Sequence, residues 1–176
     1  LLKAINELKP THYAIAFDTK APTFRHQMFE RYKAHRPATP AELVGQLGRV
    51  RQLVKAFHIP IFELDGYEAD DVLGTLSHQA SQQKIATIIV TGDADIMQLV
   101  SPWVSVLYPK SGGMSFSDTL LYDDTMVNEK YGVKPERIAD LKALVGDPSD
   151  NIPGVRGIGD KTAVRLIQQF GSLEEI

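Results

Sequence analysis

The sequence contains no cysteine, which excludes disulfide bonds and every metal site built on thiolates, iron–sulfur clusters included. It also has no apolar run near the ~20 residues that cross a bilayer, and no basic-then-apolar segment at its start. Internal repeats and low-complexity tracts are missing as well. We therefore expect a cytoplasmic protein without a membrane span or a signal peptide.

Two familiar kinds of catalytic centre are also missing. The five histidines show no ligand spacing such as His-Glu-x-x-His, so zinc catalysis is not expected. No Ser-His-Asp or Cys-His arrangement suggests a nucleophilic enzyme. With 176 residues, 43% hydrophobic and 23% charged, the chain has the size and composition of one globular domain, or of one domain with a small appendage.

Charge is distributed unevenly along the chain, whose net charge is −3. Residues 19–55 hold eight basic and two acidic side chains, a net charge of +6, whereas residues 56–176 carry −9. A basic segment beside an acidic region suits a polyanion that is held while metal ions act on it. The alternative interpretation of the basic segment is a solvated helix face.

Apolar runs typical of strands alternate with helical periodicity over the first 110 residues. Strands near 13–17, 59–64, 85–91 and 104–108, with helices near 41–57, 68–83 and 94–100, predict an α/β fold with a mostly parallel twisted sheet flanked by helices. Ser111-Gly112-Gly113 then predicts a turn, and helices are expected near 124–131, 135–146 and 160–170. The predicted domains are an α/β core over 1–110, with a basic segment at 20–37, and a helical region over 111–176.

Acidic residues follow three of the predicted strands closely. Because ligands bind outside the carboxyl ends of parallel strands, we expect these acids to face one crevice, together with two acids further along the chain. Such crowding requires bound cations, and all-oxygen ligands favour Mg²⁺ or Mn²⁺ over zinc. The candidate metal ligands are Asp18, Glu68, Asp70, Asp71, Asp93, Asp95, Asp147 and Asp150.

Each acidic motif also has a purely structural interpretation. The acids of residues 68–71 could match the dipole of a following helix. Asp93 could cap the segment after it, and residues 147–151 could form an ordinary turn.

A glycine-rich hairpin follows the last two acids. Glycines at 154, 157 and 159 allow close backbone approach, and the amides of the helix that they open suit phosphate binding. Lys161 and Arg165 add positive charge. A link between two helices with no ligand is the alternative interpretation.

Several motifs occur together and in order: Phe17-Asp18, Thr23-Phe24-Arg25-His26, Tyr32-Lys33-Ala34-His35-Arg36-Pro37, Glu68-Ala69-Asp70-Asp71, Thr91-Gly92-Asp93, and Gly146-Asp147-Pro148-Ser149-Asp150-Asn151-Ile152-Pro153-Gly154-Val155. Over essentially all 176 residues the sequence closely resembles the 5′-nuclease domain of bacterial DNA polymerase I, within the flap endonuclease and phage 5′-exonuclease family. Family members begin with a strand that bears a further aspartate and end with additional helices. The resemblance therefore implies a chain truncated at both ends.

The resemblance implies a PIN-like 5′-nuclease fold with a C-terminal helix–hairpin–helix region. It implies a structure-specific 5′-3′ exonuclease or flap endonuclease that hydrolyses DNA phosphodiesters by two-metal catalysis in replication and repair. The implied cofactors are two Mg²⁺ or Mn²⁺ ions, with a K⁺ ion at the helix–hairpin–helix. The implied partner is DNA with 5′ flaps, nicks or ends. We expect a monomer with no membrane partner, and a polymerase domain can follow in the parent chain.

The resemblance also implies roles for individual residues. All eight candidate acids fall on the family's metal site, and residues 20–37 match its basic arch. The expected catalytic residues are Lys33, Arg36 and Asp93. The expected DNA-binding residues are Arg25, Tyr32, Lys33, Arg36, Gly154, Gly157, Gly159, Lys161 and Thr162. Two alternatives stay open, a non-catalytic DNA-binding fragment and a metal-dependent ribonuclease of related fold.

Overall fold

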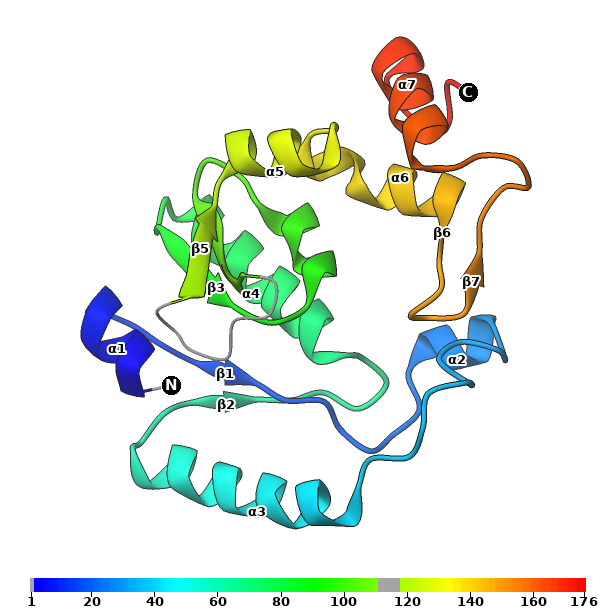
Figure 1. Cartoon of the computed structure of the whole chain (residues 1–176). Coiled ribbons are helices and arrows are strands. Elements are labelled where there is room, and N and C mark those ends of the chain that lie inside the picture. The colour runs from blue at the N-terminus through cyan, green and yellow to red at the C-terminus, as the bar shows by residue number, and fades with distance from the viewer. Residues whose placement is uncertain (1, 111–117) are drawn as a thin grey trace. The chain divides into compact units, whose positions relative to one another are not determined.

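The computed structural model describes residues 2–110 and 118–176, and the described chain divides into two compact units (Figure 1). The first unit ends at Leu73 and the second is Gly74–Ile176. The turn predicted at Ser111-Gly112-Gly113 lies outside the described residues, and the domain boundary predicted near residue 110 stays a prediction. None of the helices in the described chain combines the length and the apolar character needed to span a bilayer.

The first unit is built around two short parallel strands. Ile15 is paired with Ile61 and Ala16 with Phe62, and Figure 1 shows the two strands side by side. Parallel pairing requires a crossover connection, which helices α2 and α3 provide. The elements are α1 (Leu2–Leu8), β1 (Ile15–Ala16), α2 (Phe24–Met28), α3 (Ala41–Ala56), β2 (Ile61–Phe62) and the first turn of α4 (Ala69–Gln82).

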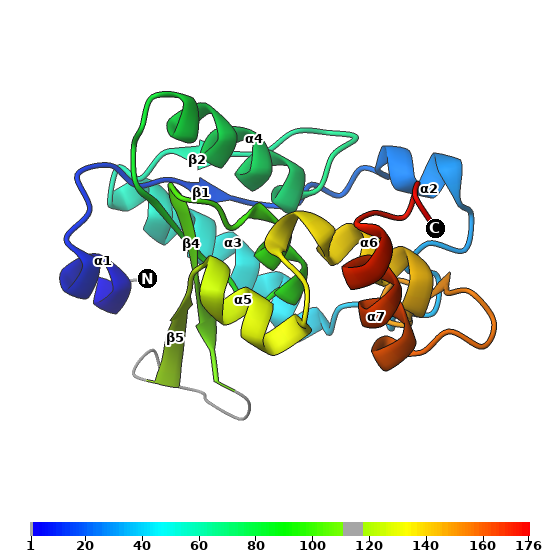
Figure 2. The same cartoon turned by 90° about the horizontal axis from the view of Figure 1, so that it is seen from above.

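The second unit contains a three-stranded sheet and most of the helices. Strand β3 runs parallel to β4, and β5 pairs antiparallel with the other edge of β4. Figure 2 shows α5 lying beside this sheet. After α4 the elements are β3 (Thr87–Val90), the 3₁₀ helix η1 (Ala94–Leu99), β4 (Val104–Pro109), β5 (Thr119–Tyr122), α5 (Asp124–Tyr131), the 3₁₀ helix η3 (Pro135–Arg137), α6 (Ile138–Val145), β6 (Gly146–Asp147), β7 (Ile152–Pro153) and α7 (Asp160–Phe170).

The core of the second unit fixes the elements that bear its acids. Met97 of η1, Val106 of β4 and Val127 of α5 are completely buried. Burying an apolar side chain of this size stabilises the fold by about 1.5–3 kcal/mol. Because η1 is anchored in this way, the acidic turn that starts it has a defined position.

The α/β architecture confirms the fold class predicted from the sequence, with two antiparallel pairs added, β4 with β5 and β6 with β7. Strand β5 is antiparallel and pairs Tyr122 with Val106. The sequence did not predict it, because four residues with a single alternation of apolar character give too weak a periodic signal.

Two glycines determine the path of the β6–β7 hairpin, which carries Asp147 and Asp150. A Cβ atom added at Gly154 would lie 2.2 Å from the carbonyl oxygen of Val145, and one at Gly146 would lie 2.4 Å from the Gly154 nitrogen. Gly146 also has a φ of +89°, which favours glycine. Only glycine therefore allows the chain to pass itself here.

We expect Gly154→Ala to destabilise the second unit by about 2–3 kcal/mol, because backbone atoms must move to admit the methyl group. Urea denaturation followed by circular dichroism measures the loss. Gly159→Ala is the matched control, since a Cβ there meets nothing within 4 Å. Equal stabilities for the two variants would show that the close approach at Gly154 is not needed for the fold.

Candidate metal centre

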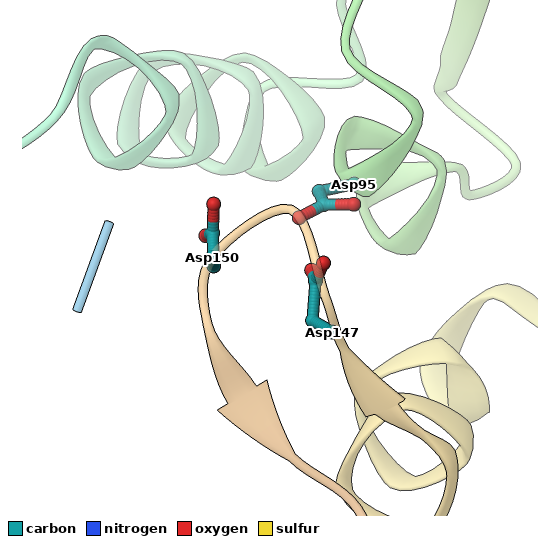
Figure 3. Close-up of side chains that lie close together, drawn as sticks. All are labelled: Asp95, Asp147 and Asp150. Carbon is teal, nitrogen blue, oxygen red and sulfur yellow. The ribbon is translucent and has the colours of Figure 1, made fainter. Parts of the chain in front are cut away.

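Three carboxylates of the second unit converge on one point. Asp95, Asp147 and Asp150 each offer an oxygen, and these three oxygens lie within 4.8 Å of one another (Figure 3). Asp95 comes from the first turn of η1, whereas Asp147 and Asp150 come from the β6–β7 hairpin. Asp147 and Asp150 are each only 8% exposed. We refer to these three residues as the aspartate triad.

Hydrogen bonds orient Asp147 within the triad. Its Oδ1 accepts from the backbone N–H of Ser149 at 2.9 Å and from the Ser149 hydroxyl at 2.6 Å. The N–H of Asp150 donates to the carbonyl oxygen of Asp147 at 3.2 Å. The segment is thus the turn of the alternative interpretation, and that turn directs two carboxylates to the same point.

A lysine that the sequence analysis missed contacts the triad. The ammonium group of Lys142, on α6, donates to Oδ2 of Asp147 at 2.7 Å and also to Oδ1 of Asp95. Asp95 is 47 residues away in the chain, so no local pattern predicts this pair. The one sequence feature that could have pointed to Lys142 is its position in the last turn of α6, five residues before Asp147.

The three charged groups have shifted pKa values with identifiable causes. Burial raises the pKa of Asp95, and the hydrogen bond from Lys142 only partly opposes this effect. Burial acts in the same direction on Asp147, but hydrogen bonds from Lys142 and Ser149 outweigh it and lower its pKa to about 2. Burial would lower the pKa of Lys142, yet its two carboxylate partners raise it. The lysine is therefore charged at neutral pH.

The donor set of the triad fits a hard divalent cation. Carboxylate oxygens are the preferred ligands of Mg²⁺, Mn²⁺ and Ca²⁺. Two oxygens on opposite sides of a Mg²⁺ ion lie about 4.2 Å apart, since each bond is about 2.1 Å long. The 4.8 Å limit within the triad requires only a small movement of the side chains.

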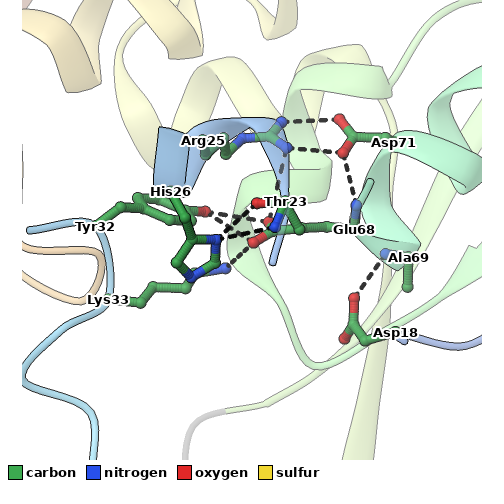
Figure 4. A network of polar contacts seen from close by, with 9 residues as sticks. All are labelled: Asp18, Thr23, Arg25, His26, Tyr32, Lys33, Glu68, Ala69 and Asp71. Carbon is green, nitrogen blue, oxygen red and sulfur yellow. Dashed lines mark hydrogen bonds and ion pairs between the residues drawn. The ribbon is translucent and has the colours of Figure 1, made fainter. Parts of the chain in front are cut away.

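The first unit gathers four acids around the N-terminus of α4, and Figure 4 shows three of them, Asp18, Glu68 and Asp71. Oδ1 of Asp18 accepts from the N–H of Ala69 at 2.7 Å, and Oδ2 of Asp71 accepts from the N–H of Glu68 at 2.9 Å. These bonds satisfy amides that a helix start leaves without partners. Asp70 lies in the same first turn. The acids therefore match the helix dipole of α4, as the structural interpretation predicted, and they are also clustered.

Basic residues of the preceding segment bind these acids directly. Arg25 donates to both oxygens of Asp71, at 2.7 and 2.8 Å. Glu68 accepts from the Lys33 ammonium at 2.8 Å and from the hydroxyl of buried Tyr32 at 3.1 Å. The Arg25 hydrogen bond is the main reason that the pKa of Asp71 lies below its ordinary value. The segment predicted to bind DNA is thus tied to predicted metal ligands of the same unit.

The remaining predicted residues have simpler surroundings. Asp93 is the N-cap of η1, and its Oδ1 accepts from the N–H of Asp95 at 2.9 Å, as the capping interpretation predicted. Arg36 is exposed, and its N–H donates to the carbonyl of Lys33 at 3.0 Å. The common crevice for all eight acids would involve both units and stays a prediction.

The glycine hairpin forms a tight turn that leads into α7. The N–H of Ile158 donates to the carbonyl of Val155 at 3.0 Å, and Gly157 has a φ of +87°. Gly159 is the N-cap of α7, and the N–H of Thr162 donates back to its carbonyl at 3.0 Å. Gly154, Gly159 and Lys161 are exposed, and Thr162 is half-buried.

Replacing Ser149 by alanine tests the hydrogen bonding of the triad. We expect Ser149→Ala to raise the pKa of Asp147 from about 2 by of order one unit, because the ionised carboxylate loses its hydroxyl donor. Carbon-13 NMR titration of the aspartate carboxyls measures the change. Ser149→Thr is the control, since it keeps a hydroxyl and should keep the low pKa.

The same substitution should change stability with a defined pH dependence. A folded pKa below the unfolded value of about 3.9 contributes stability above that value, and this stability is lost as the pH falls toward 2. Ser149→Ala should therefore lose stability at neutral pH and lose less on acidification than the wild type does. Parallel stability curves for both proteins between pH 5 and 2, or an unchanged pKa of Asp147, would contradict this assignment.

Comparison with known proteins places the chain in a family. A model described as "5′-3′ exonuclease, N-terminal resolvase-like domain" matches residues 1–132, and one described as "5′-3′ exonuclease, C-terminal SAM fold" matches residues 133–176. Among curated proteins, DNA polymerase I of Bacillus caldotenax is 48% identical over 176 residues, and that of Chloroflexus aurantiacus is 49% identical over 177. Both matches cover 100% of this chain but only 20% and 19% of the relatives, so the chain spans about a fifth of their length.

Solved structures share the fold. A mutant of T5 5′-exonuclease superposes with a TM-score of 0.82 at 23% identity, over 99% of this chain and 64% of that one. T5 5′-exonuclease with bound divalent zinc ions gives a TM-score of 0.79 at 24% identity, over 99% and 66%. These likenesses confirm the fold predicted from the resemblance. Since the two family models together match the chain from residue 1 to residue 176, the chain belongs to the 5′-3′ exonuclease family.

Proposed function

We propose that this chain is a structure-specific 5′-3′ exonuclease and 5′-flap endonuclease that hydrolyses DNA phosphodiesters in replication and repair. The observation that carries the proposal is the aspartate triad, an all-carboxylate centre in a chain of the 5′-3′ exonuclease family. T5 5′-exonuclease has been solved with zinc ions, and T5 flap endonuclease with DNA and metal ions, which supports it.

The proposed cofactors are two Mg²⁺ or Mn²⁺ ions. Bound divalent ions lower the pKa of an attacking water and offset charge on the leaving oxygen. The triad, with Asp93 beside it, would hold one ion, and Ser149 keeps Asp147 turned toward it. Asp18, Glu68, Asp70 and Asp71 would hold the other, at the N-terminus of α4.

The basic segment of the first unit would handle the phosphate. The Lys33 side chain is 22% exposed, and its ammonium group lies beside Glu68, a proposed metal ligand, which supports a role in offsetting charge on the phosphate. Arg25 and Tyr32 are fixed by the same acids. Arg36, exposed on the same segment, would contact the DNA backbone.

The glycine hairpin would bind the duplex without reading its sequence. The start of α7, which no side chain caps, and exposed Lys161 suit phosphate contact, with Gly154, Gly157, Gly159 and Thr162 shaping the turn. We also propose a K⁺ ion bound at the turn of the glycine hairpin. The proposed substrates are 5′ flaps, nicks and ends, bound by a monomer. The length of the polymerase relatives supports a polymerase domain in the parent chain.

Removing the metal or a ligand tests the nuclease directly. A labelled 5′-flap should be cut with Mg²⁺ and left intact in excess EDTA. Asp150→Asn should lower the rate about 100-fold or more, since an ion ligand loses its negative charge without a change of shape. Asp124→Asn, on the exposed start of α5, is the matched control and should cut normally. Cleavage that continues in EDTA would overturn the proposal, and faster cleavage of an RNA flap would favour the ribonuclease.

Lys33→Ala should separate catalysis from binding. We expect single-turnover cleavage to fall about 10²-fold or more, because the charge acts mainly in the transition state. Flap affinity in Ca²⁺ should change less than about threefold. Lys20→Ala, an exposed lysine of the same segment, should leave both quantities near wild type. Equal losses of rate and affinity would make Lys33 a binding residue only.

A further inference from the structure

Lys142 occupies the oxygens that an ion in the triad would need. Its ammonium group bridges Oδ1 of Asp95 and Oδ2 of Asp147, two of the carboxylates that converge within 4.8 Å. No sequence motif assigns this lysine a role, and it lies within the second unit together with the whole triad.

The hydrogen bonds of Asp147 determine which of its two oxygens Lys142 and a metal ion would compete for. Its Oδ1 already accepts from the N–H and the hydroxyl of Ser149, at 2.9 and 2.6 Å. Its Oδ2 accepts from Lys142 at 2.7 Å. An ion that binds Asp147 while Ser149 stays in place must therefore take Oδ2, the oxygen that the ammonium group holds.

The ammonium group also suits the triad electrostatically when no divalent ion is bound. Three carboxylates this close disfavour one another's ionised forms, and a positive charge between two of them offsets that repulsion. A divalent ion does the same with twice the charge. The ammonium group and a divalent ion cannot bind the same oxygens at the same time, because two positive charges that close together repel strongly.

The lysine is able to leave. Its side chain is 35% exposed, and a four-carbon stem with freely rotating bonds can carry the ammonium group into water. Asp95 and Asp147, in contrast, are held by η1 and by the β6–β7 hairpin. Exchange of the cation therefore requires no rearrangement of the backbone.

We infer that Lys142 is an exchangeable internal counter-ion of the aspartate triad. When no divalent ion is bound, its ammonium group binds Asp95 and Asp147, and a divalent ion that enters the triad displaces it. The inference rests on the metal site of the proposed function. Its consequence is that Lys142 sets the free-ion concentration at which the triad is loaded.

Metal affinity is the first test. Lys142→Met keeps the approximate length of the side chain and removes its charge. Lys134→Met, at the start of η3, is the matched control. Mn²⁺ binding to the full chain is followed by electron paramagnetic resonance. If Lys142 holds the triad about nine-tenths of the time, its removal should tighten Mn²⁺ binding about tenfold. Adding Asp150→Asn to Lys142→Met should abolish this gain, which assigns it to the triad.

Amine reactivity is the second test, because a nearby charge alone would also weaken ion binding. In the wild-type chain, acylation of Lys142 is followed by mass spectrometry with and without saturating Ca²⁺. Displacement predicts faster labelling of Lys142 in Ca²⁺ and an unchanged rate at Lys134.

The outcomes separate the inference from the function on which it rests. Mn²⁺ affinity that is equal in wild type and Lys142→Met overturns the exchange while leaving the metal site intact. Tighter binding combined with Ca²⁺-insensitive labelling of Lys142 also overturns it, since the lysine then stays in place. Absence of Mn²⁺ binding in both folded proteins overturns the proposed metal site and the exchange together.

Discussion

Repulsion between carboxylates is the constraint to which both units respond. In the second unit three aspartates meet, and Lys142 bridges two of them. In the first unit, Arg25 and Lys33 bind Asp71 and Glu68, while the N-terminus of α4 receives Asp18. The two solutions use the same physics, since a nearby positive charge or a helix dipole lowers the cost of holding an anion.

In the second unit, packing holds the backbone in place around the acids. The contact between Gly146 and Gly154 fixes the hairpin, and the buried Met97 anchors η1. The acids are therefore held in position by packing, whereas the cations that neutralise them lie on longer, half-exposed side chains. A site with fixed anions and movable cations is suited to exchanging one positive charge for another, and this property connects the fold to the proposed chemistry.

Local signals in the sequence predicted much of this fold. The helices expected near 124–131 and 160–170 are present as Asp124–Tyr131 and Asp160–Phe170, because an Asp123 cap and glycine stops mark their ends. Strands β1 and β2 are shorter than predicted, since the length of a strand is set by the register of its partner. The motif resemblance predicted the family, which the comparisons confirm.

Long-range pairing could not be predicted in the same way. The contact of Lys142 with Asp95 joins residues 47 positions apart, and that of Arg25 with Asp71 joins residues 46 apart. Periodicity and capping rules act over a few residues and contain no information on such pairs. At Asp93 a local signal is present but does not discriminate, because an aspartate in that position fits a helix cap and a metal ligand equally well.

The central claim is that the aspartate triad is a divalent-metal site whose internal cation gives way to the ion. Crystals of the chain grown with Mn²⁺ and measured at the manganese absorption edge test it most directly. The account predicts an anomalous peak within bonding distance of Asp95, Asp147 and Asp150, with the Lys142 ammonium group moved away from both carboxylates. A triad without an anomalous peak, in which Lys142 still bridges Asp95 and Asp147 at saturating Mn²⁺, would contradict it.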